Sequence, residues 1–175
     1  MSWVPGFSPA PTNRRRDVNS TTWTTRPATP DDADRVAFHA LPDAVSAGED
    51  LANFAAWIRP RIASRQYVGW LAIADDATGA VIAGAGAMLL DWGPTRANPG
   101  GCMARVNHVF TQPAWRRRGI ARRLLQSVLA DCEALGVREF CLGARPDARG
   151  LYESLGFVAY PQEMRRRVPP VSPGS

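Results

Sequence analysis

The clearest hydrophobic pattern in the chain follows residue 119 and has the period of an α-helix. Apolar residues recur three or four positions apart, at Ala121, Leu124, Leu125, Val128, Leu129, Cys132 and Leu135. This spacing predicts an amphipathic helix of about four turns that buries one face and ends at Gly136. Just before it, residues 103–111 (MARVNHVFT) are rich in β-branched and aromatic side chains, which predicts a strand. Pro113 has no N–H to donate, so sheet pairing should stop there.

Shorter patterns fill the rest of the chain. Strands are predicted at residues 23–26, 67–74, 80–90, 139–143, 157–160 and 164–167, and a short helix at 147–155. Helices should also begin near Thr29, which precedes Pro30 and two aspartates, and near Ser46, which opens a capping-box pattern. Pro60 should kink or end the second of these. The fold class is therefore α/β (α+β), with a mixed, mostly antiparallel sheet of about six to seven strands between helices.

Length and hydrophobicity place the protein among single-domain, water-soluble chains. The chain has 175 residues, of which 45% are hydrophobic, and it holds no apolar run near the ~20 residues of a membrane span. The N-terminus lacks the apolar core of a signal peptide, so a cytoplasmic protein is expected. We predict one domain over residues 23–168, a flexible N-terminal extension over 1–22 and a tail over 169–175.

The net charge of +5 is concentrated at the two ends of the chain. Residues 1–20 hold three arginines and one aspartate, and residues 165–175 hold three arginines and no acid. The segment between them is neutral, so the predicted fold has no basic stripe of the kind a nucleic-acid surface needs. The cysteines, at positions 102, 132 and 141, are odd in number and have no metal-ligand spacing, so no metal is expected.

Residues 112–121 (QPAWRRRGIA) form the predicted turn between the strand and the long helix. A helix start leaves about four N–H groups without partners and carries a partial positive charge, which suits a phosphate. Gly119 has no Cβ and Ala121 is small, so a ligand could approach the backbone closely. Arginines here oppose the helix dipole unless an anion is bound. A solvated basic helix end is the simpler alternative.

Two motifs in this order are similar to those of the GNAT superfamily of N-acetyltransferases. Arg116-x-x-Gly119-x-Ala121 resembles the family's Arg/Gln-x-x-Gly-x-Gly/Ala signature, with alanine in place of the commoner final glycine. Residues 151–157 (LYESLGF) resemble its LYxxxGF segment. The resemblance covers roughly residues 24–168. It implies transfer of an acetyl group from acetyl-CoA to a primary amine of a small molecule or protein, by direct attack on the thioester.

The resemblance also implies which residues bind the donor. The strand end would pair its backbone with the pantetheine arm, and the turn would bind the pyrophosphate mainly through backbone N–H groups. The implied acetyl-CoA-binding residues are Val109, Phe110, Thr111, Arg116, Arg117, Arg118, Gly119, Ile120, Ala121 and Arg122. The family's strand carrying these residues diverges from the next one, and the thioester lies in the gap.

For catalysis, the resemblance assigns Tyr152 as the acid that assists the leaving thiolate. A base is harder to identify, because Arg105 stands roughly where many relatives have a glutamate. Asn107 shares the face of Arg105 and is the candidate for orienting a water or the substrate. His108 should point to the opposite face, where a packed or surface side chain is favoured over a catalytic base. Deprotonation of the amine through water is therefore the expected route.

The implied partners are acetyl-CoA and an amine acceptor, with no nucleic acid and no membrane. The sequence leaves undecided whether the protein forms a homodimer. The alternative function is a non-catalytic acyl-CoA-binding regulatory module of the same fold. A third reading, a nucleic-acid-binding module that uses the arginine turn, is disfavoured by the neutral central segment.

Overall fold

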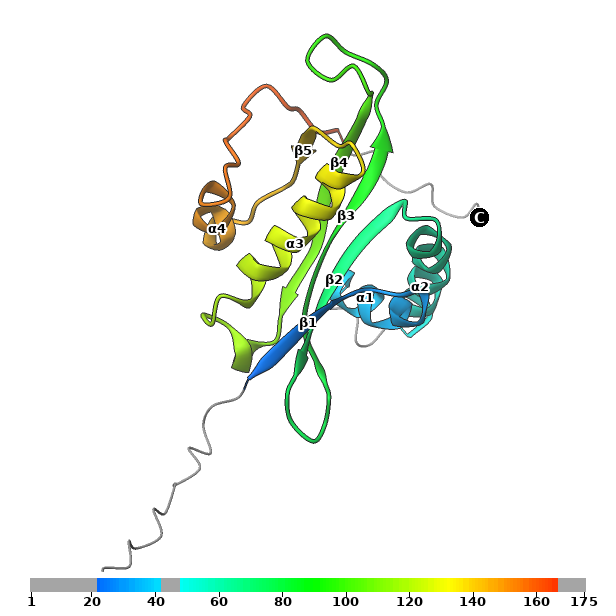
Figure 1. The fold of residues 1–175 in the computed structure, drawn as a ribbon, viewed down its shortest axis with the longest axis vertical. Coiled ribbons are helices and arrows are strands. Elements are labelled where there is room, and N and C mark those ends of the chain that lie inside the picture. The colour runs from blue at the N-terminus through cyan, green and yellow to red at the C-terminus, as the bar shows by residue number, and fades with distance from the viewer. Residues whose placement is uncertain (1–21, 42–47, 167–175) are drawn as a thin grey trace, which may run out of the picture.

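The computed structural model describes residues 22–41 and 48–166. Apart from Thr22, the predicted N-terminal extension lies outside these residues, as do the predicted tail and the start of the capping box at Ser46. The described residues hold one sheet, whose strands are β1 (Trp23–Pro27), β2 (Tyr67–Ala74), β3 (Val81–Asp91), β4 (Cys102–Thr111) and β5 (Glu139–Cys141). The strands lie in sequence order, β1-β2-β3-β4-β5 (Figure 1). Only the β4–β5 pair is parallel.

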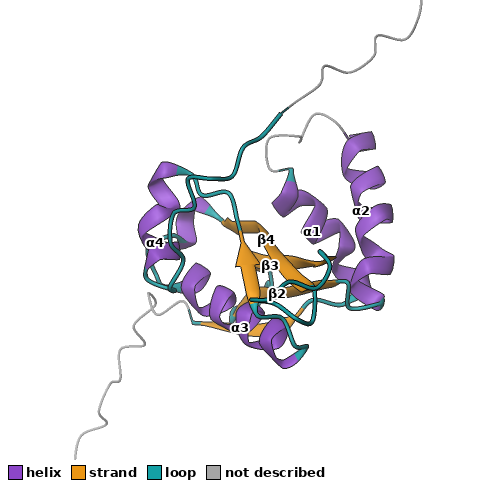
Figure 2. Ribbon diagram, turned by 90° about the horizontal axis from the view of Figure 1, so that it is seen from above, coloured by secondary structure: helices purple, strands orange, loops and turns teal. Residues whose placement is uncertain are grey.

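Helices cover both faces of this sheet (Figure 2). One face carries α1 (Ala33–Ala40) and α2 (Gly48–Ala63), and the other carries α3 (Ile120–Ala134). The short helix α4 (Arg149–Glu153) follows β5 and lies on the α3 side. The predicted fold class, a mixed and mostly antiparallel sheet between helices, is confirmed. No described helix is long and apolar enough to cross a membrane.

The number of strands differs from the prediction of six to seven. The structure has five strands, and residues 157–160 and 164–166 form no strand pair. Val158 and Met164 are almost fully exposed, so this segment has no buried face to stabilise pairing. Pro60, predicted to kink or end the second helix, does not end it, because α2 continues through Pro60 to Ala63.

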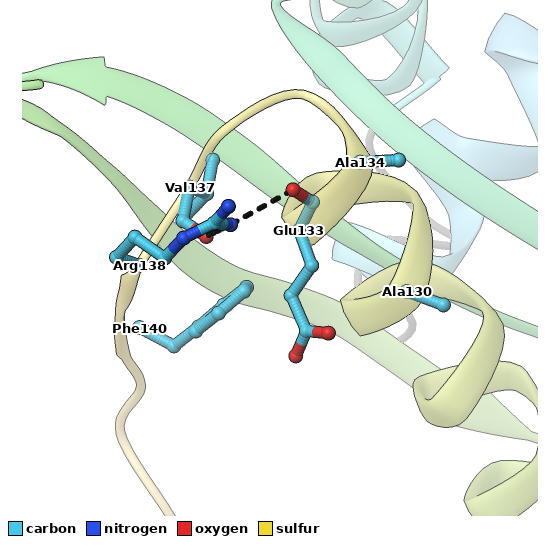
Figure 3. Close-up of a pocket in the computed structure, with 6 residues that line it drawn as sticks. All are labelled: Ala130, Glu133, Ala134, Val137, Arg138 and Phe140. Atoms are coloured by element: carbon cyan, nitrogen blue, oxygen red, sulfur yellow. Dashed lines mark hydrogen bonds between the residues drawn. The ribbon is translucent and has the colours of Figure 1, made fainter.

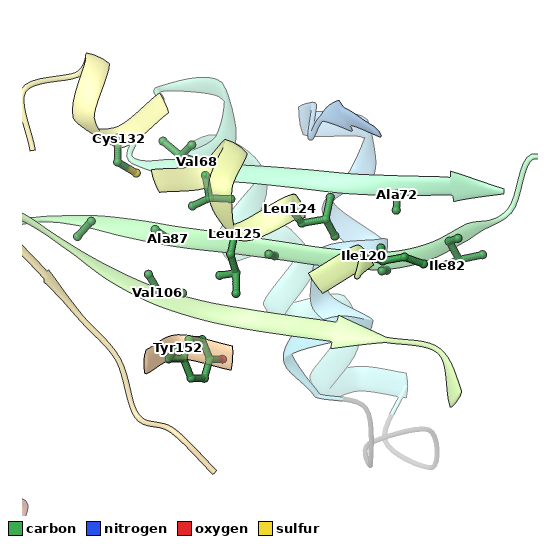
Figure 4. Packing of buried hydrophobic residues seen from close by; sticks show 14 of the residues in the cluster. Val68, Ala72, Ile82, Ala87, Val106, Ile120, Leu124, Leu125, Cys132 and Tyr152 are labelled. Carbon is green, nitrogen blue, oxygen red and sulfur yellow. The ribbon is translucent and has the colours of Figure 1, made fainter. Parts of the chain in front are cut away.

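The long predicted helix forms as α3, and its apolar face fills the larger core (Figure 4). Leu124, Leu125 and Val128 are fully buried against the sheet, where small residues such as Ala87 leave room for them. Burial of each such side chain stabilises the fold by about 2 kcal/mol. At the far end of the predicted face, Leu135 is substantially exposed. This packing fixes the N-terminus of α3 beside the end of β4.

An ion pair between the partly exposed Arg26 and the buried Asp32 anchors β1 to the start of α1. Arg26 donates from both terminal nitrogens to Asp32, at 2.7 and 2.8 Å, and the Thr29 N–H donates to the same carboxylate at 2.8 Å. Burial alone would raise the pKa of Asp32, but these donors outweigh it and hold that pKa at about 2. Thr29 is the N-cap at this helix start, as predicted, and it forms a capping box with Asp32.

We expect Asp32→Asn to lower the free energy of unfolding by about 2 kcal/mol at neutral pH, because charge-assisted hydrogen bonds are lost. The folded-state pKa lies below the unfolded value, so this stability is complete above pH ~4. It is lost as the pH falls from ~4 towards the folded pKa of about 2. Urea denaturation at pH 7 and pH 2.5 measures the difference. The matched control is Asp31→Asn in the same turn, whose side chain is fully exposed; equal effects of the two substitutions would contradict the prediction.

Candidate active site

The site begins where β4 and β5 diverge. The two strands pair only between Met103 and Arg105 on β4 and Glu139 and Cys141 on β5. Beyond Arg105, β4 continues to Thr111 with no strand on that side among the described residues. Part of its backbone is therefore open to hydrogen bonding with a ligand. Val109, Phe110 and Thr111, expected to pair with the donor, all lie in this stretch.

A β-bulge interrupts β4 within the same stretch. Gly84 of β3 pairs with Phe110 and Gly86 pairs with Asn107, so Ala85 stands opposite both His108 and Val109. His108 adopts a φ of +54°, which is rare for a residue other than glycine. The bulge reverses the alternation of side chains from that point on. His108 consequently contacts Phe54 of α2 and Tyr67 of β2. The prediction that it would face away from Asn107 is therefore wrong.

The arginine turn has the backbone shape of an anion cradle. Pro113–Trp115 form a short 3-10 turn, after which Arg117 and Gly119 take φ angles of +64° and +77°. Gly119 is the N-cap of α3, and no side chain caps that helix start. The first N–H groups of α3 are thus left for a ligand or solvent. A Cβ at Gly119 would meet nothing within 4 Å, so the space in front of the helix is open.

The arginine side chains divide into two sets. Arg116 turns back, and its Nε donates to the Thr111 carbonyl at 3.1 Å. The Arg118 guanidinium stacks over the Trp115 ring, 4.9 Å from its centroid. Arg117 and Arg122 lie exposed beside the helix start. Arg116 and Arg118 therefore shape the turn, and Arg117 and Arg122 add surface charge around it.

Tyr152 projects from α4 into the core on the α3 side, next to Val106 and Leu125 (Figure 4). Only 9% of the residue is exposed, and Phe157 packs edge-on against its ring at 6.0 Å. Burial raises the pKa of Tyr152, so the phenol stays protonated at neutral pH. Tyr152 also lines a hollow of about 630 Å³ that includes Cys141, the last paired residue of β5, and Leu142, which follows it. The predicted acid is thus on the β5 side of the divergence.

A second hollow, of about 540 Å³, lies at the C-terminal end of α3 (Figure 3). Ala130, Val137 and Phe140 line it, and Arg138 crosses its edge to donate to the Glu133 carbonyl at 2.9 Å. The arginine turn is at the opposite end of the same helix. This hollow therefore takes no part in the site.

On the opposite face of the sheet, β4 meets an aromatic group from α1, α2 and β2. His39 stacks on Phe110 with centroids 5.1 Å apart, and Phe38 packs edge-on against Phe110. The Tyr67 hydroxyl and His108 Nδ1 share a hydrogen bond of 3.3 Å. All these rings lie on the α1–α2 side of β4.

Burial keeps the titratable members of this group neutral. It lowers the pKa of His108 to about 4. It also lowers the pKa of His39 to about 4, with smaller contributions from the positive charges of His108 and Arg35. The pKa of Tyr67 is raised by burial. A cation is therefore disfavoured on this side of the strand.

Sequence reasoning missed Tyr67 and His39 as neighbours of the site. A Cβ at Gly86 would overlap the Tyr67 hydroxyl, and a Cβ at Gly84 would overlap the His39 ring. The alternating glycines of residues 84–86, inside a predicted strand, were the available signal, because strand glycines often mark a close approach. The partners themselves come from distant elements, which no local pattern identifies.

Asn107, the candidate substrate residue, has an unusual environment. In the part of the chain that the structure describes, its Oδ1 is the one buried side-chain nitrogen or oxygen atom without a hydrogen-bond partner. Since Val106 faces α3, alternation puts Asn107 on the α1–α2 side together with His108. A buried acceptor left unpaired costs about 1–3 kcal/mol, which a ligand donor would remove.

Comparison with solved structures finds the same fold in acetyltransferases. A GCN5-related N-acetyltransferase from Ralstonia eutropha JMP134 is 26% identical, with a TM-score of 0.70 over 84% of this chain and 99% of that one. A predicted acetyltransferase from Clostridium acetobutylicum, solved with acetyl-CoA, is 20% identical, with a TM-score of 0.73 over 83% and 96%. An aminoglycoside N-acetyltransferase in complex with CoA is 18% identical, with a TM-score of 0.65 over 86% and 97%.

Sequence comparison gives the family directly. No curated protein matches the chain significantly. Residues 47–168, well over half of the chain, match the family model for the acetyltransferase (GNAT) domain. The two motifs that suggested this family, around Gly119 and Tyr152, both lie inside the matched segment. Together with the diverging strands and the uncapped start of α3, this match shows that the chain belongs to the GNAT family of acetyltransferases.

Proposed function

We propose that the protein is an N-acetyltransferase that moves the acetyl group of acetyl-CoA to a primary amine of a small molecule or protein. The observation that carries this proposal is the uncapped N-terminus of α3 beside the end of β4, whose β5-side edge has no partner strand among the described residues. An elongated ligand that ends in phosphates matches this combination of open backbone and positive helix end.

The residues present fit such a donor. The backbone of Val109 to Thr111 would hold an extended amide-bearing arm, as a neighbouring strand would. The N–H groups of Gly119, Ile120 and Ala121 would hold the pyrophosphate, because Gly119 leaves the approach open. Arg117 and Arg122 would add charge at the rim. When bound, acetyl-CoA supplies a thioester carbonyl for attack by the amine and a thiolate leaving group.

Tyr152 is proposed to assist the departure of the thiolate. Its raised pKa keeps its proton available as a hydrogen-bond donor. Full transfer from a phenol of pKa about 10 to a thiolate near 8.5 is uphill by about 2 kcal/mol before burial is counted. We therefore assign Tyr152 a hydrogen bond that shortens as negative charge develops on sulfur.

Asn107 is proposed to orient the acceptor. Its unpaired Oδ1 can accept a hydrogen bond from the amine N–H. This contact would hold the amine nitrogen near β4. Because Asn107 carries no negative charge, it would not stabilise an ammonium ion as a carboxylate would, so the site favours an amine that enters in its neutral form. That preference agrees with the burial that disfavours cations on this face.

Acetyl-CoA at one hundred times its Kd is expected to stabilise the protein by about 2.7 kcal/mol, because only the folded state binds it. A thermal shift assay measures this effect. Pantetheine, which lacks the phosphates, is the control ligand. A thiol-release assay with benzylamine, spermidine, an aminoglycoside, amino acids and peptides then tests transfer. Absence of a shift with acetyl-CoA would contradict the proposal. A shift without thiol release from any amine would favour the non-catalytic acyl-CoA-binding module.

A further inference from the structure

We propose that His108 is the catalytic base that takes the proton from the acceptor amine, and that Tyr67 is the positioning residue that holds its ring. This inference rests on the proposed N-acetyltransferase function and replaces deprotonation through water. It is carried by the bulge, the His108–Tyr67 hydrogen bond and the unpaired oxygen of Asn107.

The bulge sets His108 on the acceptor side of β4. An uninterrupted strand would turn this side chain towards α3, behind the strand. The extra residue and the φ of +54° instead bring it to the face that Asn107 occupies. Left-handed backbone is unfavourable for a residue with a Cβ, so the surrounding packing must hold His108 there.

The ring of His108 is held by two contacts. The Tyr67 hydroxyl lies 3.3 Å from Nδ1, and Phe54 packs edge-on against the ring at 5.2 Å between centroids. Tyr67 is itself fully buried, and the absence of a side chain at Gly86 makes room for its hydroxyl. If Nδ1 donates its proton to the tyrosine oxygen, Nε2 keeps a lone pair for the amine.

The electrostatic surroundings suit a neutral base. Tyr67 from β2 and His39 from α1 are the titratable groups that face His108 among the described residues, and α2 contributes the uncharged Phe54. His108 therefore stays neutral at working pH, and the burial that keeps it neutral also makes it a weak base. The same burial lowers the pKa of a bound amine, so the substrate is held in its attacking, neutral form.

The lone pair of the neutral amine forms the new C–N bond, the C–S bond breaks, and the electron pair of that bond leaves with sulfur. The N–H proton becomes acidic as the nitrogen lone pair enters the C–N bond, so a weak base can accept it at that moment. His108 Nε2 takes this proton and later gives it to water, while Tyr152 hydrogen-bonds the thiolate.

The first test is independent of activity. The chain has two histidines, so ¹⁵N-histidine labelling gives two imidazole spectra, and His39→Gln assigns them. We expect His108 to carry its proton on Nδ1 with Nε2 bare, and Tyr67→Phe to shift the population towards the Nε2–H form. A wild-type His108 protonated on Nε2 would overturn the proposal, because that nitrogen would have no lone pair to accept the proton.

The second test is kinetic. His108→Asn and His108→Gly both suit a positive φ, and each should lower kcat at least tenfold with the acetyl-CoA Kd unchanged. Free imidazole should restore part of the turnover of the glycine variant, at least fivefold, and should not affect the asparagine variant. Turnover within threefold of wild type in His108→Asn overturns the proposal. If wild type shows neither a thermal shift nor transfer, the proposed function fails, and the tautomer measurement still decides the role of Tyr67.

Discussion

Replacing Tyr152 with phenylalanine is expected to lower kcat at least tenfold while the acetyl-CoA Kd stays unchanged. The ring would remain in the α3-side core beside Val106 and Leu125, so packing is preserved. Only the hydroxyl is lost, and its hydrogen bond to the thiolate forms mainly in the transition state. Steady-state thiol release gives kcat, and titration calorimetry gives the Kd.

The matched control for this substitution is Tyr160→Phe. Tyr160 lines the same hollow as Tyr152, but 70% of it is exposed. Removal of its hydroxyl should leave both kcat and Kd as in wild type. Equal turnover of Tyr152→Phe and wild type would remove Tyr152 from the mechanism, whereas a change in Kd alone would reassign it to donor binding.

Gly119→Ala is expected to raise the acetyl-CoA Kd about thirtyfold, equivalent to about 2 kcal/mol for a lost charge-assisted hydrogen bond. The added methyl group would stand in the open space before α3, where the pyrophosphate is proposed to approach. The positive φ would also strain the backbone by about 1–2 kcal/mol. Calorimetric titration with acetyl-CoA measures the change.

The control substitution Gly136→Ala separates the effect of backbone strain from the effect of blocking the proposed pyrophosphate position. Gly136 follows the other end of α3 with a φ of +90°, and a Cβ there also meets nothing within 4 Å. The two substitutions should lower the melting temperature by similar amounts, and only Gly119→Ala should weaken donor binding. A similar Kd in both variants would show that the pyrophosphate does not lie against Gly119.

The elements around the proposed donor side were predictable because their signals are local. The 3.6-residue period fixes α3, Pro113 ends β4, and the arginine turn lies between them, all within residues 103–135. The side-chain roles at this turn were less accessible to prediction. Arg116 and Arg118 are held by Thr111 and Trp115, and neither contact follows from the spacing of the motif.

The last strands were not predictable for a different reason. Residues 157–160 and 164–167 have strand-like composition, but strand propensity reflects packing on a half-buried surface. In the structure, Tyr160 and Met164 are exposed, so this composition has no surface to pack on. Only Arg167 of the predicted pair lies outside the described residues.

The acceptor side was least accessible from the sequence. His108, Tyr67 and Asn107 are brought together by β2, β4 and a bulge, and strict alternation put His108 on the wrong face. A bulge depends on how two strands align, which a single sequence does not encode locally. The glycines of β3 were the one visible trace of that arrangement.

The bulge divides β4 into two parts in which side chains alternate between the two faces of the sheet in opposite order. Up to Asn107, even-numbered residues such as Val106 point to α3; beyond it, odd-numbered residues such as Val109 do. Losing a single residue at this position would remove the bulge and restore one alternation along the strand, and Phe110 would keep its place on the α1 side. Straightening the strand at its present length would instead exchange the two faces and turn Phe110 away from α1. The orientation of the strand end therefore depends on the extra residue being accommodated as a bulge.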